Sequence, residues 1–429
     1  MRFYRKQNST NKNADIAFFL YFTGMALFFT KTYIQLALQL GILAYVAYFK
    51  FSDKIHFNKA VKRNLTFLFA WFGVFTIFAK LSEGWAYSQK ADSNTVLTLF
   101  RILAIAVALF LYVTDYSKAI SVIKSFIYSN VIMSLTVLLT TPLSQYGKAG
   151  DEGFGNIIGQ QRNVFGAIMS FMVLLCILFY QYENFKHGKK LAIFFTFSLL
   201  CSGSRGAMLQ LLIILILYVV TIPGLKRKFK YISCAIVVGI VGVVLLQNIP
   251  YLYETVWIRF EGLINTVLGI DVAADSSAQG RELYKVLAWE MFDHKPILGY
   301  GVDGFFCFLR DVEFVEGVYL PPRYSHCNFT EIASCFGIVG MIIWYSPVFY
   351  VLIKSFMLRK AAPHMNTVFI ILTSMIILDY ARIPWMTHIS MYTYFCIILF
   401  FFFIQDELKQ KQGLYRRMRQ FGSLSEVDD

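Results

Sequence analysis

The chain has 429 residues, of which 57% are hydrophobic, 17% aromatic and only 15% charged. This composition lacks the charged coat of a soluble domain of the same length, so it excludes a soluble globular protein and indicates an integral membrane protein. The formal net charge of +14 can signal a nucleic-acid partner. Here the basic residues cluster between apolar runs, which indicates membrane topology instead.

Apolar stretches recur along the whole chain, each roughly 15 to 20 residues long and therefore long enough to cross the hydrocarbon core. They predict an all-α polytopic protein with about twelve transmembrane helices in a single domain, residues 1–429. The first stretch is expected to be an uncleaved span, because a second apolar run follows it at once. The predicted spans lie near 16–30, 33–49, 64–81, 95–114, 124–140, 164–181, 191–202, 207–222, 231–247, 332–353, 365–380 and 388–404.

Two of these spans contain polar or helix-breaking residues. The stretch 191–202 ends in Ser202-Gly203-Ser204-Arg205, which predicts a hairpin that brings Arg205 to the outer surface between two helices. Pro347 interrupts the stretch 332–353, where a proline is expected to break the helix.

Most of the 40 Lys and Arg residues fall in loops on one side of the predicted bundle. The positive-inside rule assigns that side to the cytoplasm, together with both termini and a basic tail at 405–429. The excess charge is then a topology signal and a contact for anionic lipids, and no nucleic-acid partner is expected. The basic clusters fall near 2–12, 50–63, 118–124, 186–190, 226–230, 354–360 and 409–419.

The longest interruption between spans, residues 248–331, is predicted to be extracytoplasmic and combines Gly, Pro, aromatic and charged residues. A loop of this size should carry the chemistry of the protein. Apolar residues from Leu283 through Val286 to Met291 recur at helical spacing, which predicts an amphipathic helix that lies along the membrane surface. The Gly-rich segment 296–305 is expected to end this helix and to fold the loop back.

Polar side chains at the outer ends of spans are costly in lipid, which makes them candidates for function. Most of them are arginines. A guanidinium suits phosphate because its planar fork donates two parallel hydrogen bonds and stays charged. Several arginines around one outward cavity would therefore suit a diphosphate at the membrane surface. The set comprises Arg101, Arg162 with Asn163, Arg205, Arg281, the group Arg323 to Asn328, and Asp379 with Arg382.

Arg205 and Arg281 have the clearest local context. Arg205 lies between Gly203 and Gly206, which let the backbone approach a ligand closely; alternatively, it caps a helix end and snorkels to lipid phosphates. Arg281 is expected in the first turn of the amphipathic helix, where a cation opposes the helix dipole unless an anion is held there. The alternative is a solvent-exposed arginine without a ligand.

His326 is the candidate for proton transfer. Arginine cannot accept a proton, so a general base in this set must be a histidine or a carboxylate. His326 lies just before the tenth predicted span, next to Tyr324 and Asn328 and with Glu331 beyond, where an acceptor hydroxyl would meet a membrane-anchored donor. The alternative is an interfacial histidine whose ring is satisfied by backbone groups.

Several motifs are missing. The sequence has no Asp-x-Asp metal motif of nucleotide-sugar transferases, no glycine-rich phosphate loop before a helix, and no CxxC or Cys/His cluster. We therefore expect neither a metal ion nor a cofactor. Cys307 and Cys327 share the outer loop, and the spacing leaves open whether they pair.

The order of these motifs resembles the O-antigen ligase and polysaccharide polymerase family. Ser204-Arg205-Gly206 is similar to the family's S-R-G element, and the run from Arg281 through Trp289 and Pro296-x-x-Gly299-x-Gly301 to Phe305 resembles its R…W…P-x-x-G-x-G…F signature. His326-Cys327-Asn328 followed by Gly337-x-x-Gly340 resembles its H-N…G-x-x-G element, except that Cys327 separates His from Asn. The Asn in Arg162-Asn163 is similar to one that the family often places there.

The resemblance implies a metal-independent, inverting membrane glycosyltransferase whose donor is a glycan on undecaprenyl diphosphate. Arg205 and Arg281 would bind the diphosphate, and His326 would orient or deprotonate the acceptor hydroxyl. Arg101, Arg162, Asn163, Tyr324, Asn328 and Arg382 would contribute to substrate binding. The implied location is the bacterial plasma membrane, with the active site on its extracytoplasmic face.

Three functions remain in play. The first is a polymerase that joins lipid-linked repeat units into a capsular, exopolysaccharide or O-antigen chain, with a chain-length regulator as a further partner. The second is a ligase that transfers the finished glycan to lipid A core or another acceptor. A transporter or flippase is the third, and it is disfavoured because no internal repeat is evident and the polar residues lie at the outer ends of the spans.

Overall fold

The computed structural model describes residues 15–28, 30–52, 57–88, 93–146, 161–222, 276–312, 314–315 and 318–422, with a few short stretches between them. The described elements are helices, apart from one two-stranded hairpin. They are α1 (Ile16–Leu27), α2 (Thr32–Phe51), α3 (Lys59–Leu68), η2 (Phe69–Gly73), α4 (Val74–Ser82), η3 (Glu83–Trp85), α5 (Ser93–Tyr112), α6 (Tyr116–Thr140), η4 (Leu143–Gln145), α7 (Arg162–Tyr182), α8 (Gly188–Cys201), α9 (Arg205–Thr221), α13 (Ser276–His294), α14 (Gly304–Val312), β1 (Phe314–Val315), β2 (Val318–Tyr319), α15 (Asn328–Leu358), α16 (Pro363–Leu378) and α17 (His388–Gly422).

The prediction of a multi-pass helical membrane protein is confirmed. Within the described residues, seven helices are long and apolar enough to cross a membrane, and α1, α9 and α16 are shorter apolar helices. Eleven of the twelve predicted spans coincide with helices; the remaining one, 231–247, falls almost wholly outside the described residues. The count of twelve and the cytoplasmic location of the termini stay predictions.

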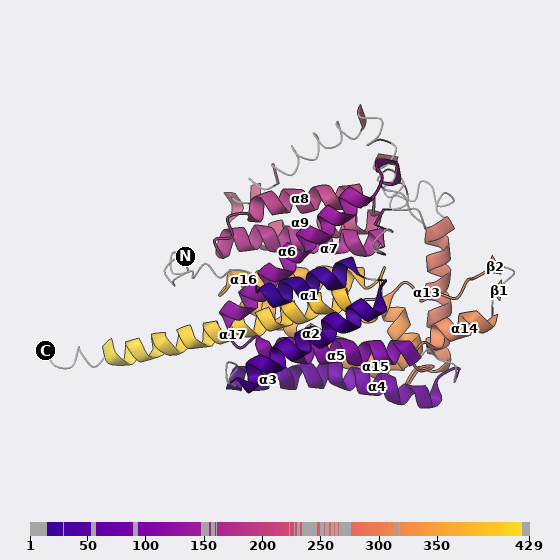
Figure 1. The fold of residues 1–429 in the computed structure, drawn as a ribbon, viewed down its shortest axis with the longest axis horizontal. Helices are drawn as coiled ribbons and strands as arrows, with labels where there is room; N and C mark the ends of the chain where they lie inside the picture. Colours follow the sequence, from indigo (N-terminus) through magenta and orange to yellow (C-terminus); the bar gives the residue numbers. More distant parts are fainter. Residues whose placement is uncertain are drawn as a thin grey trace.

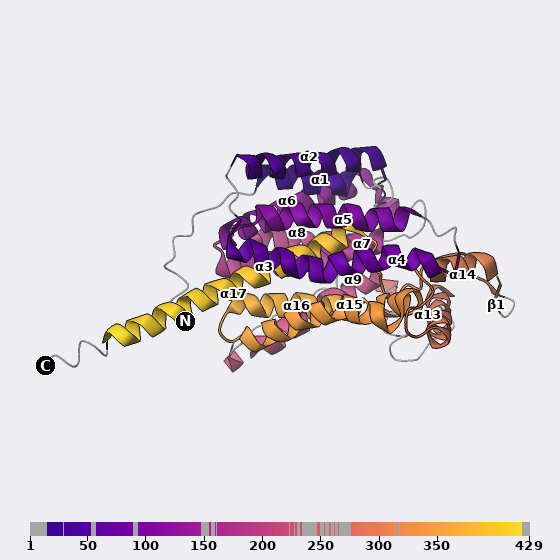
Figure 2. The ribbon, with the colours of Figure 1, turned by 90° about the horizontal axis from the view of Figure 1, so that it is seen from below.

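The long helices run side by side in one bundle (Figure 1). Helix α7 packs against α8 and α9, and α16 connects this group to α15 and α17. Seen from below, α1 and α2 lie on one face and α15 and α16 on the opposite face (Figure 2). Helix α13 lies across one end of the bundle, with α14 and the hairpin beside it, whereas α17 extends past the other end (Figures 1 and 2).

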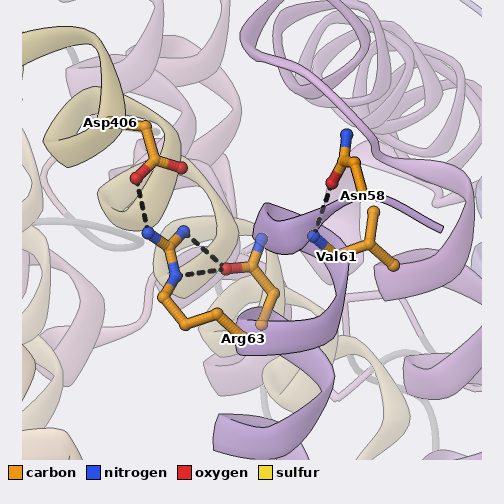
Figure 3. A network of polar contacts seen from close by, with 5 residues as sticks. Asn58, Val61, Arg63 and Asp406 are labelled. Carbon is orange, nitrogen blue, oxygen red and sulfur yellow. Dashed lines mark hydrogen bonds and ion pairs between the residues drawn. The ribbon is translucent and has the colours of Figure 1, made fainter. Parts of the chain in front are cut away.

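Three of the helices that start at the α17 end of the bundle, α1, α3 and α6, are capped by short polar side chains. Asp15 Oδ1 accepts a hydrogen bond from Phe18 N (3.1 Å), and Asp115 Oδ1 accepts one from Lys118 N (3.0 Å). Such caps satisfy backbone N–H groups that have no partner within the helix. Asn58 caps α3 in the same way, through Val61 N at 2.8 Å (Figure 3).

A salt bridge fixes α17 at this end. Arg63 Nη1 donates to Asp406 Oδ1 at 2.5 Å, and the same guanidinium donates from Nε and Nη2 to Asn64 Oδ1 (Figure 3). The Arg63 guanidinium also lies over the ring of Phe402. Asp406 falls within the predicted tail 405–429, but α17 continues without a break through Gly422.

Buried aromatic side chains hold η2, α4, α15 and the loop before α17 together. Trp71 Nε1 donates to the Trp344 carbonyl at 3.0 Å, and Phe75 packs edge-on against Phe336 and Trp385. Large rings bury much apolar area, and their edge-to-face geometry restricts how the helices rotate. This core therefore sets the position of the loops that follow α4 and precede α15.

Helix α15 breaks at Gly337 and not, as predicted, at Pro347. Gly337 has φ 62° and ψ −163°, whereas Pro347 lies inside the helical run. The positive φ is accessible to glycine without a Cβ clash. Another segment of the chain occupies the space beside Gly337, and this segment causes the break.

Candidate active site

The Gly-rich segment after α13 fills the break in α15. Tyr300 N donates to Ser334 O (2.9 Å) and Gly301 N to Cys335 O (2.7 Å), while Ile338 N donates to Pro296 O (2.8 Å). A broken helix leaves backbone groups without intrahelical partners, and these bonds satisfy them. The expectation that this segment ends the helix and folds the loop back is confirmed.

Two glycines allow this close approach. A Cβ on Gly337 would lie 2.3 Å from Ile297 O, and one on Gly299 would lie 2.5 Å from the Cys335 backbone. Both residues also have positive φ. The P-x-x-G-x-G and G-x-x-G elements, 40 residues apart in the resemblance, are therefore one structural unit. This unit supports the segment that carries His326.

Helix α13 begins earlier than predicted, at Ser276. Arg281 therefore lies in the second turn, and the argument from a cation in the first turn is wrong. Arg281 is exposed. Val286, predicted on the apolar face, is 51% exposed, and the buried face is formed by Tyr284, Leu287 and Met291.

Polar contacts fix α13 against its neighbours. The Tyr284 hydroxyl donates to Pro321 O at 3.0 Å. Lys285 Nζ is 2.8 Å from Glu282 Oε1 and 3.6 Å from the centroid of the Tyr380 ring. Helix α13 is thus held to the loop before α15 and to the loop after α16.

His326 lies between α13 and the start of α15. Its backbone is left-handed, with φ 59°, and its half-buried ring is 5.8 Å from that of Tyr284. Burial, and to a smaller extent the nearby charges of Arg281, Arg323 and Lys285, together lower the pKa of His326 to about 4. The structure thus brings Arg281 into electrostatic range of His326, as the sequence analysis required, and keeps the imidazole neutral at physiological pH.

Tyr324 lies on the other side of this segment. Its ring is 5.6 Å from that of Phe306, and its hydroxyl meets Thr95 at the start of α5. Burial and the carboxylates of Asp303 and Glu331 raise the pKa of Tyr324. Tyr324 therefore remains protonated and can donate a hydrogen bond. Cations lie on the His326 side of the segment and carboxylates on the Tyr324 side.

Asn328 is buried and connects α15 to the loop after α16. Its Nδ2 donates to the Tyr345 hydroxyl (2.7 Å) and to Asp379 Oδ2 (3.1 Å), and its N–H donates to Asp379 O (2.6 Å). Arg382, in the same loop, lies over the Phe171 ring at 5.5 Å. Among the described residues, its buried Nε and Nη2 have no hydrogen-bond partner.

The hairpin between α8 and α9 is present where it was predicted. Gly203 has φ 59°, and Ser204 caps α9. Ser204 Oγ donates to Asn163 Oδ1 at 2.8 Å, which joins the hairpin to the start of α7. Arg205 is the first residue of α9, but its side chain lies outside the described part of the structure.

Two further candidate arginines lie on α5 and α7. Arg162 begins α7, next to Asn163. Arg101 lies within α5, half-buried and within electrostatic range of His388 at the start of α17.

The described residues show whether Cys307 and Cys327 form a disulfide and whether side chains cluster as metal ligands do. Cys307 and Cys327 are both buried free thiols, so the open possibility of a disulfide is not realised. Within the same part of the chain, no group of three or more His, Cys, Asp or Glu side chains is arranged to hold a metal ion.

Glu331 and Ser325 form contacts around His326 that sequence reasoning did not assign. Glu331 is fully buried, and its Oε2 accepts a hydrogen bond from Ser325 N at 2.7 Å. An acidic residue early in a helix that reaches back to a preceding N–H is the pattern of a capping box. Here the acid lies one residue further into the helix and the N–H belongs to Ser325, two residues before the N-cap Cys327, so the capping-box pattern did not predict this contact.

Comparison with known families agrees with the resemblance. A family model described as O-antigen ligase matches residues 190–345. The matched range runs from α8 into α15 and includes Arg205, Arg281 and His326. No curated protein matches the chain.

Proposed function

Since residues 190–345 carry the O-antigen ligase match, we propose that this multi-pass membrane protein is a polymerase of undecaprenyl-diphosphate-linked repeat units. It would build a capsular, exopolysaccharide or O-antigen chain at the extracytoplasmic face of the bacterial plasma membrane. The observation that carries the proposal is the half-buried, neutral His326 beside three cations at one end of the bundle.

The three cations support a diphosphate donor. Arg281 and Arg323 are exposed, whereas Lys285, one helical turn from Arg281 on α13, is buried and paired with Glu282. One guanidinium can donate two parallel hydrogen bonds to the oxygens of a phosphate. Its positive charge also stabilises the negative charge that grows on the leaving diphosphate as the glycosidic bond breaks. Arg205, at the start of α9, is proposed as a further diphosphate ligand.

Other candidate ligands support binding further from the bond that breaks. The Nε and Nη2 groups of Arg382, which have no hydrogen-bond partner in the described part of the chain, favour an anion or a polar sugar group. Arg101, Arg162, Asn163, Tyr324 and Asn328 are retained as proposed substrate-binding residues. Tyr324 is suited to this role because its hydroxyl, which meets Thr95, stays protonated and can donate a hydrogen bond.

His326 is proposed as the acceptor-side base. A neutral imidazole accepts the proton of the attacking hydroxyl, which then adds to the anomeric carbon on the face opposite the diphosphate and inverts its configuration. The donor helps this step. Its negative charge offsets Arg281, Arg323 and Lys285, so the pKa of His326 rises when the donor binds and the imidazole becomes a stronger base.

Transfer to a different acceptor is the second candidate, and the printed description of the matching family favours it. An O-antigen ligase uses the same donor side but delivers the glycan to lipid A core or another acceptor. The distinction depends on the acceptor alone, and the proposed roles of Arg281 and His326 are the same in both reactions.

Purified protein in lipid nanodiscs tests the proposal. Incubation with lipid-linked repeat units alone should give a ladder of glycan lengths if the protein is a polymerase. Product that forms only after a lipid A core acceptor is added would replace the polymerase with the ligase. No glycan transfer under either condition overturns both.

A further inference from the structure

The backbone of His326 is held in an unusual conformation. It is one of three residues other than glycine with positive φ among the described residues, together with Asn184 and Asp303. This region is sparsely populated for side chains with a Cβ and persists only when surrounding contacts impose it. The contacts that impose it therefore decide where the imidazole points.

Those contacts come from both neighbours of His326. Ser325 Oγ donates to Cys327 O at 2.9 Å, and Thr330 Oγ1 donates to Ser325 Oγ at 2.9 Å and to Cys327 O at 3.2 Å. Glu331 N also donates to Cys327 O, at 2.9 Å. These hydrogen bonds fix residues 325 and 327 to the first turn of α15, and residue 326 lies between them.

Glu331 provides the contact that pins residue 325 through its backbone. Glu331 Oε2 accepts the Ser325 N–H at 2.7 Å, and Oε1 accepts from Cys335 Sγ at 3.7 Å. Both oxygens are thus engaged, and the side chain has no exposed surface. A carboxylate in this position does not reach a substrate, although a carboxylate buried at the end of an apolar helix is costly.

We infer that Glu331 is a positioning residue, which closes the 325–331 loop so that the His326 imidazole lies against Tyr284 of α13, where the acceptor would bind. This inference rests on the proposed function, because it assigns Glu331 a role in the same transfer. It differs from a catalytic role in one respect. Only the hydrogen-bond acceptor of Glu331 is needed, and its negative charge is not.

The variants therefore separate the hydrogen-bond acceptor of Glu331 from its charge. Glu331→Gln keeps an amide oxygen that accepts the Ser325 N–H, while Glu331→Met has similar length and helix propensity but no comparable acceptor. Cys335→Ala is the matched control, because it removes the other partner of the carboxylate and leaves the Ser325 contact in place.

The expected results follow from misplacement of the imidazole. Glu331→Met should lower kcat for glycan transfer about 100-fold, since small displacements of a reacting group have effects of this size. Its KM for the lipid-linked donor should stay within about twofold of wild type, because the cations that bind the donor lie on α13 and at residue 323. Glu331→Gln should restore kcat to within about fivefold of wild type, and Cys335→Ala should behave like wild type.

Two outcomes overturn the inference. One is wild-type kcat in folded Glu331→Met. The other is a Glu331→Gln protein as slow as His326→Ala, which would make the charge itself necessary; this outcome remains decisive if Glu331→Met does not fold. Neither is confused with failure of the proposed function, in which wild-type protein and all variants alike transfer no glycan.

Discussion

The two ends of the bundle surround their histidines with opposite charge. At the α17 end, His364 Nε2 lies 2.9 Å from Glu183 Oε1, and Arg63 pairs with Asp406 at 2.5 Å. At the α13 end, His326 faces Arg281, Arg323 and Lys285, of which Lys285 is itself paired with Glu282. Among the ion pairs of the described residues, neither Arg281 nor Arg323 takes part.

The two histidines make the contrast specific. His364 is buried beside a carboxylate, whereas His326 is half-buried beside cations. A histidine next to a carboxylate connects helices, as His364 on α16 does with the residue that follows α7. A histidine among cations is surrounded by charge that an anionic ligand can neutralise. This difference is the basis of our proposal that the α13 end binds the anionic donor, whereas the contacts at the α17 end stabilise the fold.

The largest expected effect is at His326. His326→Ala should reduce glycan transfer by about 10²- to 10⁴-fold, the usual contribution of general acid–base catalysis. Transfer rates of purified protein measure this, and binding of the lipid-linked donor should be kept. His364→Ala is the matched control at the other end, and an equal loss of transfer there would remove the distinction between the two histidines.

The second-largest effect is expected at Arg281. Arg281→Ala removes a proposed stabiliser of the leaving diphosphate, so kcat/KM should fall about 100- to 1,000-fold, as for other groups that stabilise developing negative charge. Arg281→Lys should recover part of this loss, because lysine keeps the charge but not the bidentate fork. Unchanged polymer yield and length in Arg281→Ala would contradict the assignment.

The pH profile separates the free enzyme from its donor complex. The active form of His326 is neutral, so activity is present above its pKa and lost as the pH falls through it. For free protein, kcat/KM should therefore fall only near pH 4, given a pKa of about 4. In the donor complex the cations are offset, so kcat should fall at a higher pH.

The effect of nearby charge on the pKa of His326 can also be tested by removing a cation instead of adding the anionic donor. In Arg281→Gln the pKa of His326 rises, because one of the charges that lower it is gone. Loss of kcat/KM on acidification should then begin at a higher pH than in wild type. Superimposable profiles for the two proteins would show that Arg281 does not act on the base.

The interlocked glycines should affect stability more than chemistry. Gly337→Ala places a Cβ 2.3 Å from Ile297 O at a positive φ, so unfolding should be easier by about 1–3 kcal/mol or more. Gly41→Ala is the control, because no atom lies within 4 Å of its added Cβ. Thermal unfolding in detergent should show a lower midpoint for Gly337→Ala and no loss for Gly41→Ala.

The smallest effect is expected at the α17 end. The side chains of Arg63 and Asp406 are 31% and 26% exposed, and pairs of this kind contribute about 0–1 kcal/mol. Arg63→Ala should therefore shift thermal unfolding slightly and leave glycan transfer at the wild-type rate. A large loss of transfer would extend the functional region to this end of the bundle.

Sequence patterns predicted the spans and the main candidates because both leave local signals. Apolar runs of membrane length mark the helices, and Gly203-Ser204-Arg205-Gly206 marks the hairpin. The start of α13 was misplaced because Ser276 to Gly280 carry no apolar pattern that separates a polar first turn from a loop. The break at Gly337 depends on a segment 40 residues earlier in the chain, and such contacts leave no local signal.

The contacts around His326 show the same limit. The residue itself was identified from its type and position, but its left-handed backbone and the role of Glu331 depend on a loop that closes in three dimensions. Likewise, Asn328 was predicted from sequence as a substrate ligand, while its buried contacts with Tyr345 and Asp379 join residues that are 17 and 51 positions further along the chain. Long-range polar partners of this kind cannot be derived from spacing alone.

The most direct test combines donor binding and transfer in one experiment. Wild type and His326→Ala are reconstituted in nanodiscs, and binding of the lipid-linked repeat and formation of longer glycan are measured on the same samples. We expect wild type and His326→Ala to bind the donor equally, and only wild type to form a longer glycan. Glycan formation by His326→Ala at the wild-type rate would contradict it.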